Sequence, residues 1–169
     1  PAKTTGETVS HVSSLSCAVI SAALEFKQCR DRWDKNTGNY AYHFEQSFKP
    51  GEISPAEAHE CGRELAQALW GDEFQVVIGT HLDKDHIHNH FAVCAVSVKD
   101  GHKLQTDHAF IRRMRAENDR ICQEHNLSVI TEPKKSGGKS YAEWLIAKNG
   151  GFTWRGQIRD DIDSLLPQV

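Results

Sequence analysis

The chain has 169 residues, of which 38% are hydrophobic and 25% are charged. This balance fits one soluble globular domain and excludes a disordered chain, and no run of about 18 apolar residues predicts a membrane-spanning helix. The net charge of −3 argues against a broadly basic nucleic-acid binder, although a local basic groove is compatible with it.

The first half of the chain predicts two strands that alternate with two helices. In order they are a strand at 9–16, a helix at 17–30, a strand at 40–48 and a helix at 55–70. Apolar residues recur at helical spacing in the helices, whereas the second strand alternates between apolar and polar positions. The second helix has the clearest start, because Ser54, Pro55 and Glu57 form a capping box with proline in the first turn.

The second half predicts a β-hairpin, a long helix and a short helical tail. In order they are strands at 73–81 and 88–98, a helix at 107–125, a basic connector at 132–140 and short helices near 141–148 and 154–166. The two strands are joined by a six-residue loop, which implies antiparallel pairing. We therefore expect a central antiparallel sheet with flanking helices, which is the α+β class.

The five cysteines are scattered and include no C-x-x-C pair. Their spacing favours reduced thiols in a cytoplasmic protein over a disulfide framework. The chain opens at Pro1 without a Met, so we expect natural residues upstream of it.

Four of the ten histidines fall in the hairpin, within the stretch THLDKDHIHNHF. Alternate residues of a strand point to one face, which places His88 beside His90. If the turn is centred between Lys84 and Asp85, His81 lies opposite His88 and shares that face. Three imidazoles in this arrangement suit a divalent metal that keeps open positions for a substrate.

Spacing alone leaves alternatives open at this hairpin. His86 and His88 form as good a pair of ligands as His88 and His90, and a structural polar network is the alternative to a metal site. Asp83 either makes the turn or orients an imidazole N–H as a neighbour of the ligands.

HLDKDHIHNHF resembles the third motif of conjugative relaxases of the HUH endonuclease superfamily, and more narrowly that of the mobilization relaxases of Gram-positive plasmids and integrative conjugative elements. HFEQSFKPGE (43–52) resembles the family's second motif. PAKTTGETVS resembles the region after the first motif, and YAEWLIAKNG and TWRGQIRDDID resemble the segment that closes the nuclease domain. We therefore expect residues 1–169 to form one relaxase nuclease domain.

This resemblance implies site- and strand-specific nicking of DNA at a transfer origin, by a tyrosine that keeps the 5′ end covalently bound. The family's spacing implies His81, His88 and His90 as ligands of one divalent ion, either Mn²⁺ or Mg²⁺, with Zn²⁺ as a further candidate. Asn89 stands where the motif usually has a hydrophobic residue.

Other residues are candidates for contacts to DNA and for catalysis. Ser47 and Lys49 in the second motif are candidate contacts to the DNA backbone, and Asp83 is the candidate catalytic residue of the loop. Further cations available for DNA are Arg112, Arg113, Arg115, Arg120, Lys134, Lys135 and Lys139, and the alternative for the arginines is a solvated helix face. The family's tyrosine lies before the segment that PAKT resembles, so we expect this chain to start after its nucleophile.

The implied partners are single-stranded or hairpin DNA of a transfer origin, relaxosome accessory proteins and a secretion-system coupling protein. Two rival functions remain. One is a DNA-binding module of the same fold that does not cut, and the other is a metal-dependent hydrolase that activates water through a base such as Asp83. Covalent capture of a labelled strand separates the relaxase from both.

Overall fold

The structure is a computed structural model that describes residues 9–82, 86–131, 145–146 and 149. The chain divides into two compact units, Pro1–Val129 and Ile130–Val169. In the second unit Leu145 and Ile146 are helical, within the helix predicted near 141–148. The predicted connector at 132–140 and the last predicted helix, near 154–166, lie outside the described residues. That residues 1–169 form one nuclease domain stays a prediction.

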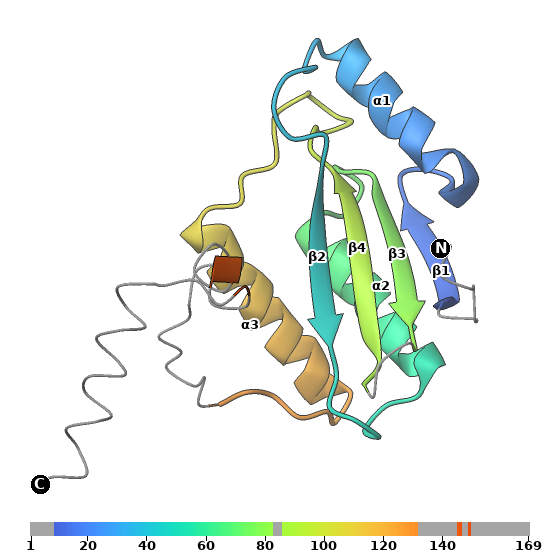
Figure 1. Cartoon of the computed structure of the whole chain (residues 1–169), viewed down its shortest axis with the longest axis vertical. Helices are drawn as coiled ribbons and strands as arrows, with labels where there is room; N and C mark the ends of the chain where they lie inside the picture. The colour runs from blue at the N-terminus through green and yellow to red at the C-terminus, as the bar shows by residue number, and fades with distance from the viewer. Residues whose placement is uncertain (1–8, 83–85, 132–144, 147–148, 150–169) are drawn as a thin grey trace, which may run out of the picture. The chain divides into compact units, whose positions relative to one another are not determined.

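A four-stranded antiparallel sheet forms the centre of the first unit, in the order β1-β3-β4-β2 (Figure 1). Its strands are β1 (Val9–Leu15), β2 (Ala41–Ser47), β3 (Val76–His81) and β4 (His88–Cys94). The hairpin of β3 and β4 has the predicted register, in which His81 pairs with His88. Together with three α-helices, this sheet confirms the predicted α+β class.

The two faces of the sheet have different coverings. Helices α2 (Pro55–Leu69) and α3 (His108–Glu124) pack on one face, and Trp70, Ile78 and Phe91 are buried in the core between them and the strands. On the other face α1 (Ala22–Arg32) packs through Phe26 at the end where β4 finishes. The opposite end of that face, where β3 finishes and β4 begins, lies away from α1 (Figure 1).

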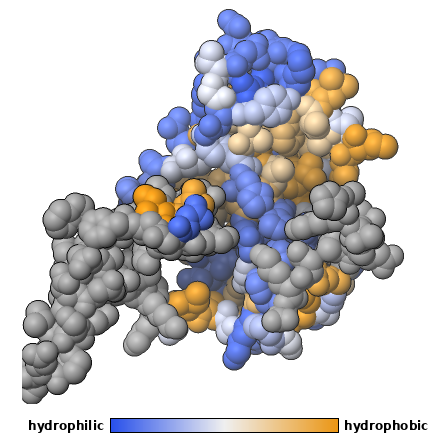
Figure 2. Space-filling view, in the orientation of Figure 1, coloured by the Kyte–Doolittle hydropathy of each residue, from blue (hydrophilic) through white to orange (hydrophobic). Residues whose placement is uncertain are grey.

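The surface of this second face follows the same division. Figure 2 shows hydrophilic residues gathered over the middle of the sheet and hydrophobic residues gathered toward α1. Of the hairpin histidines on this face, His81 and His90 are partly exposed, whereas His88 is buried.

Helix α2 begins as the sequence predicts. Ser54 Oγ accepts a hydrogen bond from Glu57 N at 3.3 Å, and the Glu57 carboxylate accepts one from Ser54 N at 3.1 Å. Gly71 follows the helix with φ +52°, a conformation that glycine adopts without strain. The helix buries four apolar residues at helical spacing: Ala58, Cys61, Leu65 and Leu69.

The first helix begins later than predicted. Val19–Ser21 form a 3-10 turn, so α1 begins at Ala22 and not at the predicted residue 17, and Val19 is 45% exposed. Ala23 is also exposed, whereas Ala22 and Phe26 are buried. The short turn rotates the chain before the α-helix starts, so positions on either side of it do not share one helical face.

Two strands are shorter than predicted. β3 begins at Val76 because the chain after α2 continues in turns, with Glu73 N donating to Trp70 O at 3.0 Å. β4 ends at Cys94, and beyond it Val96 forms only an isolated bridge with Lys103. The apolar patterns continue past both strand ends because these residues remain in the core.

The cysteines behave as structural residues. All five are free thiols, and four of them are buried. Burial raises the pKa of Cys29 to about 11 and that of Cys61 to about 12, so both remain protonated and unreactive at neutral pH. Among the described helices, none has the length and apolar content to cross a membrane.

Candidate metal centre

Three histidines of the β3–β4 hairpin meet on the face away from α2 and α3. One ring nitrogen from each of His81, His88 and His90 lies within 4.8 Å of those from the other two. The ring of His90 lies 4.4 Å from that of His81 and 4.8 Å from that of His88, measured between centroids. Because metal–nitrogen bonds are about 2.0–2.1 Å, small rotations of these rings suffice for all three to bind one ion.

His86 lies beside this group but is not part of it. Its ring centroid is 5.4 Å from that of His88, and its backbone oxygen lies 3.3 Å from His88 Nδ1. Because a carbonyl oxygen only accepts hydrogen bonds, His88 Nδ1 carries the proton and donates it. The unprotonated Nε2 is then the atom that can bind a metal. Of the two ligand sets that spacing left open, the geometry favours His81, His88 and His90.

His43 of β2 is a neighbour of the site that the sequence reasoning missed. Its Nε2 lies 2.7 Å from His90 Nδ1, and the two rings stack with centroids 4.8 Å apart. A ligand imidazole held at Nδ1 in this way binds a metal through Nε2. The alternation of residues 40–48 indicated the face of His43, but its contact with His90 depends on the pairing of β2 with β4.

The electrostatics of the group favour the ligand form of His90. Burial lowers the pKa of His90, and the neighbouring His81, His43 and His88 lower it further, whereas Glu45 opposes them. A metal binds the neutral imidazole, so protons compete less with it at this position than at an ordinary histidine.

The remaining predicted site residues are placed differently. Ser47 pairs with His88 across β2 and β4, and its hydroxyl donates to Glu45 Oε1 at 2.9 Å on the histidine face. Lys49 follows the end of β2 and is exposed. Asp83 lies outside the described residues, so its catalytic role stays a prediction.

Helix α3 packs on the face of the sheet opposite the histidines, but its Arg115 lines a cavity together with Glu45, Gln46 and Ser47 of the edge strand β2. Arg113 donates to Ala68 O at 2.8 Å, and Arg120 pairs with Glu117 and Glu124 on its own helix. The contacts of Arg113 and Arg120 are those of a solvated helix face. The connector lysines that were also predicted to meet DNA lie outside the described residues.

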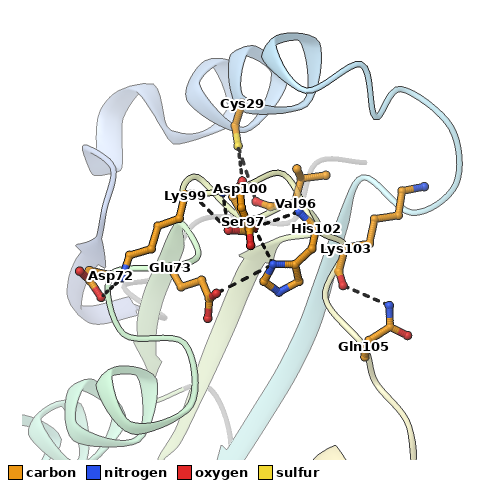
Figure 3. A network of polar contacts seen from close by, with 10 residues as sticks. All are labelled: Cys29, Asp72, Glu73, Val96, Ser97, Lys99, Asp100, His102, Lys103 and Gln105. Carbon is orange, nitrogen blue, oxygen red and sulfur yellow. Dashed lines mark hydrogen bonds and ion pairs between the residues drawn. The ribbon is translucent and has the colours of Figure 1, made fainter.

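A second group of possible ligands lies at the far end of the sheet, near α1 (Figure 3). It consists of Glu73, Asp100 and His102. Asp100 Oδ1 accepts from His102 Nδ1 at 2.6 Å and from His102 N at 3.2 Å, and these bonds, the first above all, help to lower the pKa of Asp100 to about 2. The polar groups of this turn thus hydrogen-bond to one another. Beside the turn, the Lys99 ammonium lies 3.0 Å from Asp72. The hairpin histidines are therefore the better candidate metal centre.

The chain is similar to known proteins over most of its length. Residues 2–127 match the family described as "Relaxase: MobA/VirD2-like, nuclease domain". A protein rlx of Staphylococcus aureus is 35% identical over 151 residues, covering 89% of this chain and 45% of the relative. Another S. aureus rlx is 38% identical over 149 residues, covering 87% and 45%. The group II intron-interrupted relaxase LtrB of Lactococcus lactis subsp. cremoris is 26% identical over 149 residues, covering 79% and 25%. The chain thus spans less than half the length of these relatives.

Proposed function

We propose that this chain, which belongs to the MobA/VirD2-like relaxase nuclease family, takes part in nicking one DNA strand at a transfer origin. The observation that carries the proposal is the meeting of His81, His88 and His90 on the sheet face away from α2 and α3. His81 and His90 are partly exposed on this face, where an extended DNA strand could approach a bound ion, whereas His88 is only 1% exposed.

The proposed role of the three histidines is to hold one divalent ion. Imidazole nitrogens suit Mn²⁺ or Zn²⁺ better than Mg²⁺, which prefers oxygen ligands. When bound, the ion would supply Lewis-acid stabilisation of charge on the scissile phosphate. The chain's own contribution is orientation: His86 O and His43 Nε2 fix two of the rings through their Nδ1 atoms.

The proposed DNA contacts follow from the position of β2. Ser47 lies on the histidine face directly opposite His88, where a hydroxyl is within reach of a strand that passes the metal. Lys49, exposed just beyond Ser47, adds a positive charge for a neighbouring phosphate. Asp83 is proposed to orient an imidazole from the loop between the metal-binding strands.

The nucleophile is proposed to be a tyrosine upstream of Pro1, and the positions of Tyr40 and Tyr42 support this. Tyr42 stacks with Phe44 and packs against the helix-side core, on the face opposite the histidines. Tyr40 OH donates to Ala23 O at 2.9 Å, and Tyr40 O accepts from Ala95 N. Ala95 stands 95 − 90 = 5 residues beyond His90, which is about 17 Å along a strand. Tyr40, which is hydrogen-bonded to Ala95, is therefore far from the proposed metal site.

β1 provides a route for such a nucleophile. Val9 pairs with His81, so the strand begins at the level of the proposed metal site. A tyrosine upstream of Pro1 would be joined to Val9 by residues 1–8, which is enough chain to bring it back to the scissile phosphate. Positioning of this kind contributes up to ~7–11 kcal/mol to lowering a barrier, which free water would forgo.

The test uses a labelled origin oligonucleotide from the element that encodes the chain, with Mn²⁺. Residues 1–169 should bind the strand without forming a covalent band on a denaturing gel. A chain extended upstream to include the expected tyrosine should form that band, and His88→Ala in the extended chain should abolish it.

Three results would contradict this proposal. A covalent band from residues 1–169 that vanishes in Tyr40→Phe or Tyr42→Phe would place the nucleophile inside the chain. Cleavage without covalent capture would indicate a hydrolase, and binding without cleavage by the extended chain would indicate a non-cutting module.

A further inference from the structure

A row of buried polar side chains crosses the sheet directly behind the three histidines. Thr80 and Asn89 are 0% exposed, and Gln46 is 5% exposed. The row continues at its ends into the two helices, through His59 of α2 and Asn118 of α3. Such groups are costly to bury unless they are hydrogen-bonded, so their partners need to be accounted for.

The bonds of the row form one directed chain. Thr80 Oγ1 donates to Asn89 Oδ1 at 2.7 Å, so its single proton is used and His59 Nδ1, at 2.8 Å, must be the donor to Thr80. Asn89 Nδ2 donates to Gln46 Oε1 at 2.8 Å, and Gln46 Nε2 donates to Asn118 Oδ1 at 2.9 Å. Each member therefore has its orientation fixed by the one before it.

Helix α2 makes a further bond to the centre of the row. Asn89 Nδ2 also donates to Ala58 O at 2.6 Å, so both amide protons of Asn89 are used. Gly62 allows this close approach, because a Cβ there would lie 2.6 Å from Asn89 Nδ2. The helix and the strand are thus in contact at the residue that separates two of the histidines.

The row and the metal-binding histidines occupy adjacent positions on the same strands. Thr80 pairs with Asn89 and Asn89 pairs with Gln46, whereas the next pairing is His81 with His88. A slip of one residue would turn the histidines into the core, and it would leave every member of the row without its partner. Buried polar groups without partners are strongly unfavourable, so the row resists that slip.

We propose that Thr80 and Asn89 are positioning residues, which hold β3 and β4 in the register and spacing at which His81, His88 and His90 share one cation. This inference rests on the proposed metal site. It goes beyond that site because it assigns a role in metal binding to buried side chains on the opposite face. A polar network that only stabilised the fold would contribute to unfolding free energy but not to metal affinity.

The experiment compares Thr80→Val with Thr80→Ser in the full chain. Valine has the shape of threonine but removes the hydroxyl that joins His59 to Asn89, whereas serine retains it. Val76→Ala, at the other end of β3 and also buried, is the matched control for lost core stability. Affinity for Mn²⁺ is measured by calorimetry, ligand geometry by the visible spectrum of bound Co²⁺, and stability by urea unfolding of the metal-free protein.

Thr80→Val should weaken Mn²⁺ binding about tenfold and alter the Co²⁺ spectrum, as changes around metal ligands commonly do. Thr80→Ser should remain near the parent, and Val76→Ala should lose stability with unchanged affinity and spectrum. Unchanged affinity and spectrum in Thr80→Val, with reduced stability, would overturn the proposal.

Amide hydrogen exchange of the metal-free chain separates this inference from the metal site itself. Thr80→Val should increase exchange at residues 88–91 more than Val76→Ala does, relative to the rest of the sheet. If exchange there is the same in both variants, the positioning role is wrong. If His88→Ala binds Mn²⁺ as well as the parent does, the metal site is wrong, whatever the exchange pattern shows.

Discussion

His43 offers a sharp test of how the site orients its ligands. His43→Leu removes the nitrogen that lies 2.7 Å from His90 Nδ1 and leaves that position without its partner in β2. A hydrogen bond of this kind contributes about 1.4 kcal/mol, which corresponds to roughly a tenfold change in affinity. We therefore expect Mn²⁺ to bind His43→Leu about tenfold more weakly than the parent, measured by calorimetry at neutral pH.

Two matched variants make this result specific. His43→Gln retains an acceptor close to the place of Nε2 and should restore most of the affinity. His102→Leu removes a histidine from the other polar cluster and should leave Mn²⁺ binding unchanged. Equal affinity in His43→Leu and the parent would refute the view that β2 orients His90.

Three further outcomes follow from other parts of the structure. Ser54→Ala should lower the free energy of unfolding by about 1 kcal/mol in urea, because the capping box of α2 is lost, and Ser54→Asp should not. Asp100→Asn should be less stable than the parent at neutral pH. Because the folded-state pKa of Asp100 is lowered from 3.8 to about 2 by His102, this difference should be fully present above pH 3.8 and disappear as the pH falls to about 2. Lys49→Gln should weaken DNA binding for all sequences and reduce the log–log salt slope by about 1, whereas Lys35→Gln, in the turn after α1, should do neither.

Local patterns in the sequence accounted for much of the fold. The capping box at Ser54 and the spacing of the hairpin histidines involve residues a few positions apart, where chain geometry alone sets the outcome. The position of the hairpin turn then determined that His81 pairs with His88. The ends of strands were harder to predict where apolar residues continue into the core beyond the strand, as after Cys94.

Contacts between distant segments could not be obtained in the same way. His43 meets His90 only because β2 pairs with β4, across 47 positions of the chain. The burial of Asn89 is similar, since its partners come from two other strands and a helix. Its polarity within an apolar stretch was a visible signal, but its meaning depends on which residues the fold brings to it.

The central claim is tested most directly by titrating Mn²⁺ into the metal-free chain and into single alanine variants of the hairpin histidines. The parent should bind one equivalent, and His81→Ala, His88→Ala and His90→Ala should each lose most of that affinity, while His86→Ala retains it. If His86→Ala loses binding as completely as His88→Ala, or if His88→Ala retains it, the proposed metal centre is wrong.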